Sequence, residues 1–147
     1  MKIESSAFKQ GEAIPVKYSC DGDDVNPPLL ISEVPPGTVS LILLVEDPDA
    51  PSKTFVHWLV FNIDPSLKQI NENSVPEGAN LGTNDFGSKN YGGPCPPSGK
   101  HRYFFKLFAI DIVLDLDSGA SKETVLTLIR DHTLGYAELM GVYGRYG

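Results

Sequence analysis

Two acidic residues separated by one proline follow a continuous apolar run. Asp47 and Asp49 belong to the segment DPDAP, and the run before them is VSLILLV at residues 39–45. The two prolines restrict the backbone on either side of Asp49, so a stiff chain presents both carboxylates where a strand ends. Paired carboxylates at a strand end suit a ligand site. A rigid turn whose Asp side chains cap backbone N–H groups is the commoner use of the pattern.

Two histidines lie in the apolar segments that follow. His57 interrupts the sequence FVHWLVFNI, and His101 precedes Tyr103 at the start of another apolar segment. An imidazole can bind an anion or move a proton near neutral pH. An isolated histidine among apolar residues is more often a hydrogen-bonded core residue, and His132 is assigned to that class. His57 and His101 are therefore candidates for a binding site only in combination with other residues.

The segment directly before His101 is rich in glycine and proline. YGGPCPPSGK, residues 91–100, holds three glycines and three prolines. Glycine permits close approach to the backbone, and proline holds a loop in shape without a long side chain. Residues 91–100 are therefore expected to form a loop that makes one wall of a binding site. The alternative is an elaborate hairpin connection.

These signals indicate one small site if the strand ends converge. The site would combine two imidazoles, two carboxylates and the amides of residues 91–100. Nearby carboxylates raise the pKa of an imidazole, so one or both histidines are expected to be protonated near neutral pH. A small ligand with a phosphate and a hydrogen-bond donor fits this set, with the phosphate on imidazolium and loop N–H groups and the donor on Asp. Anion affinity is then expected to fall as pH rises through the histidine titrations.

The elements that must position these residues are mainly strands. Residues 39–45 are typical of a strand buried on both faces. Residues 55–63 and 103–110 alternate with apolar side chains on both sides, as in central strands. Weaker strand candidates are residues 2–8, 14–18 and 29–31.

Only one segment has the pattern of a helix. Ser121 is placed to act as its N-cap, an apolar face extends from Val125 to Met140, and Gly141 is placed to end it. Short strands and one late helix indicate a mainly β fold, an antiparallel β-sandwich with a C-terminal helix. Residues 71–90, rich in Asn, Gly and Ser, are expected to form a long surface excursion with a function of its own.

Length and composition restrict the class of protein. The 147 residues predict a single domain, 1–147. A net charge of −7 and the lack of basic clusters argue against a nucleic-acid partner. No apolar segment has the length of a signal peptide or a membrane span, so a soluble, cytoplasmic protein is expected. Cys20 and Cys95 are then expected to be free thiols, with a disulfide as the less favoured alternative. No motif predicts a metal or another cofactor.

Three motifs in order resemble the phosphatidylethanolamine-binding protein family, which includes the Raf kinase inhibitor protein. They are DPDAP, FVHWLVFNI and YGGPCPPSGKHRYFF. Flanking sequences that fit are KYSCDGDDVNPPL, VPPGTVSL and HTLGYAELMGVYGRY. The resemblance covers nearly the whole chain and is to the shorter bacterial and archaeal branch of the family.

The resemblance implies a fold and a set of pocket residues. The implied fold is an antiparallel Greek-key β-sandwich with a small anion-binding pocket at one end. Arg102 alternates away from its neighbours and is expected to brace the structure against an Asp. Eukaryotic members usually carry Trp where this chain has Phe55 and have a longer connection after DPDAP, so one rim of the pocket is expected to be more open here. The ligand-binding residues implied are Asp47, Asp49, His57, Gly93, Pro94, Pro97, His101 and Tyr103.

The implied function is binding and regulation without catalysis. The pocket is expected to accept a phosphate group on a small molecule, a lipid headgroup or a phosphorylated side chain, and the output to be inhibition of a kinase or a serine protease. One alternative is a small hydrolase that uses the His and Asp residues, with Cys95 as a conceivable nucleophile. Another is a protein-facing inhibitor that acts through residues 71–90. A homodimer through Tyr136, Tyr143 and Tyr146 is compatible with the sequence, as is a core closed by the same residues.

Overall fold

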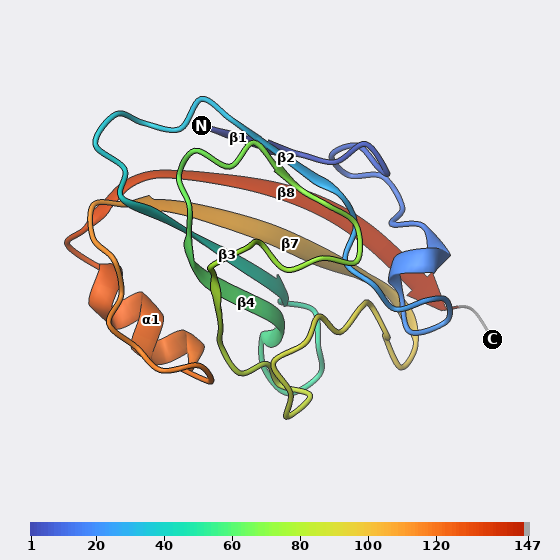
Figure 1. Ribbon diagram of the computed structural model, residues 1–147. Coiled ribbons are helices and arrows are strands. Elements are labelled where there is room, and N and C mark those ends of the chain that lie inside the picture. Colours follow the sequence, from blue (N-terminus) through green and yellow to red (C-terminus); the bar gives the residue numbers. More distant parts are fainter. Residues whose placement is uncertain (146–147) are drawn as a thin grey trace.

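Two antiparallel sheets and one α-helix make up the computed structural model, which describes residues 1–145 (Figure 1). The smaller sheet has the strand order β1-β2-β5, and the larger has the order β6-β4-β3-β7-β8. The strands are β1 (Lys2–Glu4), β2 (Leu29–Ser32), β3 (Ser40–Asp47), β4 (Phe55–Ile63), β5 (Gln69–Ile70), β6 (Asn80–Leu81), β7 (Gly99–Ile110) and β8 (Thr133–Arg145). The helices are the 3-10 turn η1 (Val16–Tyr18) and α1 (Lys122–Ile129). The mainly β fold predicted from the sequence is confirmed.

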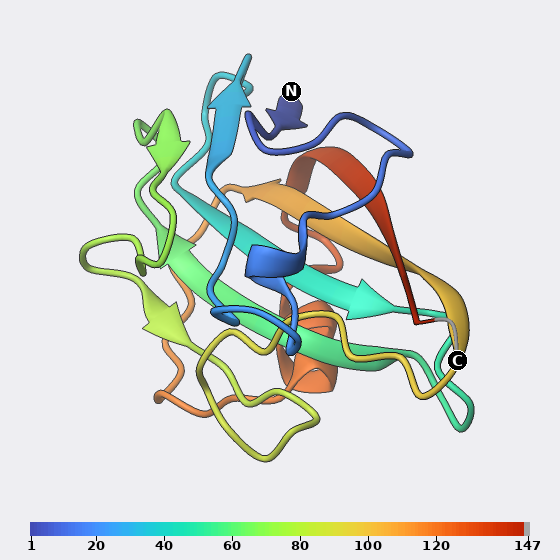
Figure 2. The same cartoon turned by 90° about the vertical axis from the view of Figure 1, so that its right-hand side faces the viewer.

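The larger sheet is covered on both faces, which explains its continuous apolar run. Every residue of β3 is buried. Alternate residues such as Leu43 pack toward the small sheet, and those between them, such as Leu44, pack toward α1 and its Ile129. Figure 2 shows α1 beneath the large sheet and the N-terminal strands on the opposite face. Two layers of core thus hold β3 and β4 rigidly, and with them the side chains at the ends of these strands.

The predicted helix is only half correct. Its N-cap is confirmed, because the Ser121 hydroxyl accepts the Thr124 N–H at 3.2 Å, but the helix ends at Ile129 and β8 follows. β8 pairs with β7 along its whole length, from Thr133 to Arg145. Gly141 does not end a helix: a side chain there would meet Ile14 at 2.5 Å. His132 lies in the turn before β8 rather than on a helix face.

The expectation of free thiols is wrong. Cys20 and Cys95 form a disulfide with an Sγ–Sγ distance of 2.07 Å and Cα atoms 5.4 Å apart. The turn at η1 and the loop before β7 also share hydrogen bonds, since the Tyr91 hydroxyl donates to the Tyr18 carbonyl at 2.8 Å and the Cys20 N–H to the Pro94 carbonyl at 3.1 Å. The pairing joins residues 75 positions apart, so it depends on the fold and not on local spacing.

Other sequence expectations are partly met. Residues 71–90 do run outside the main strands, but they include β6 and return against β4, where the Asp85 carboxylate accepts the Val56 N–H at 2.7 Å. The segment 14–18 forms η1 instead of a strand, and β1 is shorter than residues 2–8. Within the described part of the chain, no helix is long and apolar enough to cross a membrane.

Candidate functional site

A cavity of about 280 Å³ lies at one end of the large sheet. Its lining comes from the end of β3 and the turn after it, the start of β4, the 71–90 excursion, and the loop and first residues of β7. We refer to it as the histidine cavity, lined by Asp47, Ala50, Pro51, Phe55, His57, Phe86, Cys95, Pro96, Pro97, His101 and Tyr103.

Strand order explains why distant sequence segments meet there. β3 lies between β4 and β7, and both neighbours run antiparallel to it. The end of β3 therefore lies beside the starts of β4 and β7, with Asp47 opposite Phe55 and Glu46 opposite Phe104. The convergence of strand ends expected from the sequence is thus present.

His101 is held by Asp47. Its Nδ1 lies 2.6 Å from Asp47 Oδ2, and both side chains are buried. A carboxylate oxygen accepts, so Nδ1 carries the proton and Nε2 is the ring nitrogen left for another partner. The other Asp47 oxygen accepts the Asp49 N–H at 2.7 Å. Asp47 therefore positions His101, and each of its two oxygens already accepts one hydrogen bond.

His57 is a buried, neutral imidazole. Its Nδ1 lies 2.7 Å from the Gly92 carbonyl, which can only accept, so Nδ1 carries the proton and Nε2 has a free lone pair. Burial lowers the pKa of His57 below its usual value of 6.5, against the smaller effects of the Gly92 carbonyl and the Asp47 carboxylate. The nearby Asp47 carboxylate does raise the pKa of His57, as expected, but desolvation outweighs it, so the expected protonation of this histidine is wrong.

Aromatic rings enclose His57 in the histidine cavity. Its ring centroid lies 5.1 Å from that of Phe55 and 5.2 Å from those of Phe86 and Tyr103. Sequence reasoning missed Phe86 as a cavity residue. The signal was present in residues 84–88 (NDFGS), where Asn84 Oδ1 accepts the N–H groups of Phe86 and Ser88 and fixes the turn that carries the ring.

The Tyr103 hydroxyl is a buried polar group beside this cavity. The residue is 1% exposed, and its hydroxyl oxygen has no hydrogen-bond partner within residues 1–145. Burial raises the pKa of Tyr103, so the hydroxyl keeps its proton. A buried hydroxyl without a partner costs free energy, which an acceptor entering the cavity would recover.

Asp49 lies outside the cavity lining. Its carboxylate binds Arg102 through two side-chain hydrogen bonds, 2.9 and 3.0 Å long, and also accepts the Arg102 N–H at 2.9 Å. These bonds lower the pKa of Asp49 to about 2, with the Arg102 side chain as the largest cause. The expectation that Arg102 braces the structure against an Asp is confirmed.

Gly93 and Pro94 also lie outside the lining, behind the wall. The Gly93 N–H donates to Asp24 Oδ1 at 2.7 Å, and a side chain on Gly93 would come within 2.1 Å of the Tyr18 carbonyl. The Gly92 N–H donates to the His57 carbonyl at 3.2 Å. The N–H groups of Gly92 and Gly93 are therefore occupied, and proline has none. The side-chain groups available to an anion are the imidazole and phenol groups of the lining.

The groups present do not form a metal site or an activated thiol. Residues 1–145 contain no group of three or more His, Cys, Asp or Glu side chains arranged to hold a metal ion. Cys95 is bonded to Cys20, so it has no thiolate to serve as a nucleophile. The hydrolase alternative therefore loses the nucleophile that the sequence suggested for it.

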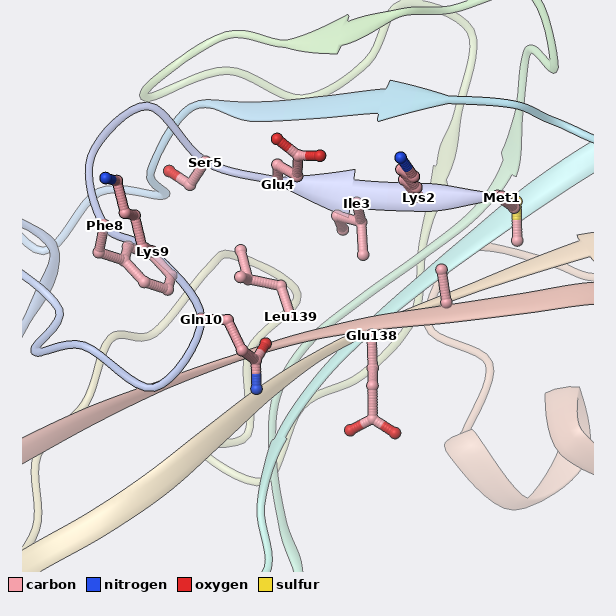
Figure 3. A pocket seen from close by; sticks show the side chains of 11 residues that line it. Met1, Lys2, Ile3, Glu4, Ser5, Phe8, Lys9, Gln10, Glu138 and Leu139 are labelled. Atoms are coloured by element: carbon pink, nitrogen blue, oxygen red, sulfur yellow. The ribbon is translucent and has the colours of Figure 1, made fainter.

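A larger cavity, of about 470 Å³, lies between the edge strands β1 and β8 (Figure 3). Ile3 and Leu139 approach one another there, while the Glu138 carboxylate points away from β1. Its lining contains no histidine and none of the ligand-binding residues predicted from the sequence. Chemistry, and not size, therefore identifies the histidine cavity as the candidate site.

Comparison with known proteins gives consistent matches. The family model "Phosphatidylethanolamine-binding protein" matches residues 4–144. A UPF0098 protein of Methanothermobacter thermautotrophicus is 49% identical, over 99% of each chain. One of Archaeoglobus fulgidus is 45% identical over 95% of this chain, which spans only 50% of that relative. A crystal structure of a phosphatidylethanolamine-binding protein homolog from Chlamydia trachomatis has 41% identity and a TM-score of 0.94, covering 99% of this chain and 97% of the other.

Proposed function

Because the chain belongs to the phosphatidylethanolamine-binding protein family, we propose that it is a non-catalytic binding protein that takes a phosphate group into the histidine cavity. One observation carries this proposal. His57, His101 and Tyr103 line the same small cavity, and each carries a polar group with an unfilled hydrogen-bonding position.

Each group has a defined role toward a phosphate. The Tyr103 hydroxyl donates to a phosphate oxygen. His101 donates through Nε2 when protonated, with Asp47 stabilising the imidazolium from the other side. His57 is neutral, so its Nε2 accepts the P–OH of a singly protonated phosphate. A phosphomonoester dianion takes up a proton as the pH falls toward about 6, so affinity is expected to rise as the pH falls from 8 toward 6.

The rest of the lining suits an organic group attached to the phosphate. Phe55 and Phe86 form one wall, and Pro51, Pro96 and Pro97 form others. Apolar walls around a few polar groups are typical of small-molecule sites. We therefore propose a phosphomonoester, either a small molecule or a phosphorylated headgroup or side chain, in preference to inorganic phosphate.

Titration calorimetry with phosphorylethanolamine tests the assignment. Tyr103→Phe removes one hydrogen bond to a charged ligand, which is worth about 1.5–3 kcal/mol, so affinity should fall roughly 10- to 100-fold. His132→Asn is the matched control, because His132 lies outside the cavity and bonds to Asp111 at 2.8 Å. Equal affinity of Tyr103→Phe and wild type would contradict the proposal.

We further propose that the bound state is read by a protein partner, with inhibition of a kinase or protease as the output. Phe86 supports this, because it is 48% exposed and also contacts His57. A partner that touches Phe86 would then sense what the cavity holds. If so, Phe86→Ala abolishes inhibition of a responsive enzyme, and His101→Asn abolishes only its dependence on ligand. Inhibition unaffected by either change would contradict this reading.

A further inference from the structure

The Cys20–Cys95 disulfide lies in the wall of the histidine cavity and within reach of solvent. Cys95 is exposed and lines the cavity, and Cys20 is partly exposed. Disulfide reactivity depends on access and on which sulfur leaves more readily as a thiolate. Both can be assessed from the neighbours of the two sulfurs.

The two sulfurs have different surroundings. Arg145 Nη2 lies 3.3 Å from Cys20 Sγ. The same guanidinium binds the Asp21 carboxylate, with contacts of 2.5 and 3.1 Å, so Asp21 offsets part of its charge but also fixes its position against the sulfur. Among the hydrogen bonds of residues 1–145, none reaches Cys95 Sγ. A guanidinium N–H stabilises a thiolate, so Cys20 is the better leaving group.

We propose that this disulfide is a thiol-exchange switch, in which an external thiol attacks Cys95 Sγ and Cys20 leaves as a thiolate beside Arg145. The S–S bond breaks as a new bond forms between Cys95 Sγ and the attacking sulfur, and Cys20 keeps the electron pair. A second external thiol then releases the first as a symmetrical disulfide and leaves Cys95 as a thiol. Two thiols are oxidised and one protein disulfide is reduced, so the reductant is a small thiol or a dithiol.

Opening the bond frees one part of the cavity wall. Hydrogen bonds anchor the loop at Gly92, Gly93 and Pro94, which precede Cys95. In the described chain none anchors Pro96, Pro97 or Ser98, so the disulfide is the cross-link that holds this segment before β7 begins. Pro96 and Pro97 line the cavity. Reduction should therefore leave the histidines in place and loosen the wall opposite them, which weakens ligand binding by loss of preorganisation.

Peptide mapping tests the chemistry without reference to any ligand. The oxidised protein is treated briefly with 2-mercaptoethanol, quenched with iodoacetamide and mapped by mass spectrometry. The mercaptoethanol adduct should lie on Cys95 and the alkyl group on Cys20. Arg145→Gln should bring the ratio of the two isomers toward one, and Arg102→Gln, which removes another surface guanidinium, should not. Equal adducts in the wild type, or no exchange in the folded protein, would overturn the proposed direction of attack.

Ligand binding tests the consequence, which rests on the proposed function. Phosphorylethanolamine affinity is measured with the disulfide intact, after reduction by dithiothreitol, and in the Cys20→Ser/Cys95→Ser variant, with folding of each form checked by NMR. The reduced forms should bind at least several-fold more weakly. Equal affinity would overturn the switch. If neither form binds, the proposed function fails, and the backbone amide signal of Ser98 then decides the switch. A change of that signal on reduction supports a loosened wall, and no change refutes it.

Discussion

Removal of the Cys20–Cys95 bond should cost a large part of the stability of the protein. The bond closes a separation of 75 residues, for which the chain-entropy relation gives about 4.5 kcal/mol at 25 °C, mostly through the unfolded chain. For 147 residues the entropy of unfolding is about 0.3 kcal/mol/K, so the melting temperature should fall by about 15 °C. The folded loop keeps its hydrogen bonds to Asp24 and Cys20, so the fold itself should persist.

Equilibrium unfolding in guanidinium chloride measures this directly. The wild type is compared with Cys20→Ser/Cys95→Ser, each with and without dithiothreitol. The reductant should destabilise the wild type by about the same amount as the double substitution and should not affect the variant. A loss below about 1 kcal/mol would refute the reasoning, because it would mean that the cross-link hardly restrains the unfolded chain.

Two further predictions concern single residues. Burial lowers the pKa of His57 in the folded protein, so the unfolded chain takes up the proton first as the pH falls. Stability should therefore decline below about pH 6.5. His57→Asn keeps a donor for the Gly92 carbonyl and should reduce that decline, measured by urea unfolding between pH 5 and 8. An unchanged dependence of the unfolding free energy on pH would contradict the assigned shift. Gly141→Ala places a methyl group 2.5 Å from Ile14 and 2.7 Å from Phe8, so it should destabilise the folded protein by about 1–3 kcal/mol in the same assay. An unchanged unfolding midpoint would show that this contact is loose.

The strands and the central site residues could be predicted because their signals are local. The run at residues 39–45 has no polar residue except Ser40, which fits a strand covered on both faces, and β3 is such a strand. His57, His101 and Asp47 come from strand ends that an antiparallel sheet must bring together. Their grouping in one cavity is therefore a consequence of topology, and their contact with a ligand remains a prediction.

The errors share a physical cause, since each depends on a partner far away in the sequence. Residues 133–140 have an apolar spacing that also fits a helix, and pairing with the long strand β7 selects a strand instead. Cys20 and Cys95 meet only because η1 packs against the loop before β7. The sequence likewise does not show that Asp49 is already paired with Arg102, or that burial would outweigh the nearby carboxylate at His57.

An NMR titration with phosphorylethanolamine tests the central claim most directly. The ring signals of His57 and His101 are followed at constant pH, with His132 as an internal reference outside the cavity. We predict that the signals of His57 and His101 move together and saturate with one dissociation constant, while His132 does not move. If His57 and His101 stay unchanged in the folded protein, or if all three histidines drift alike without saturation, the histidine cavity is not a phosphate site.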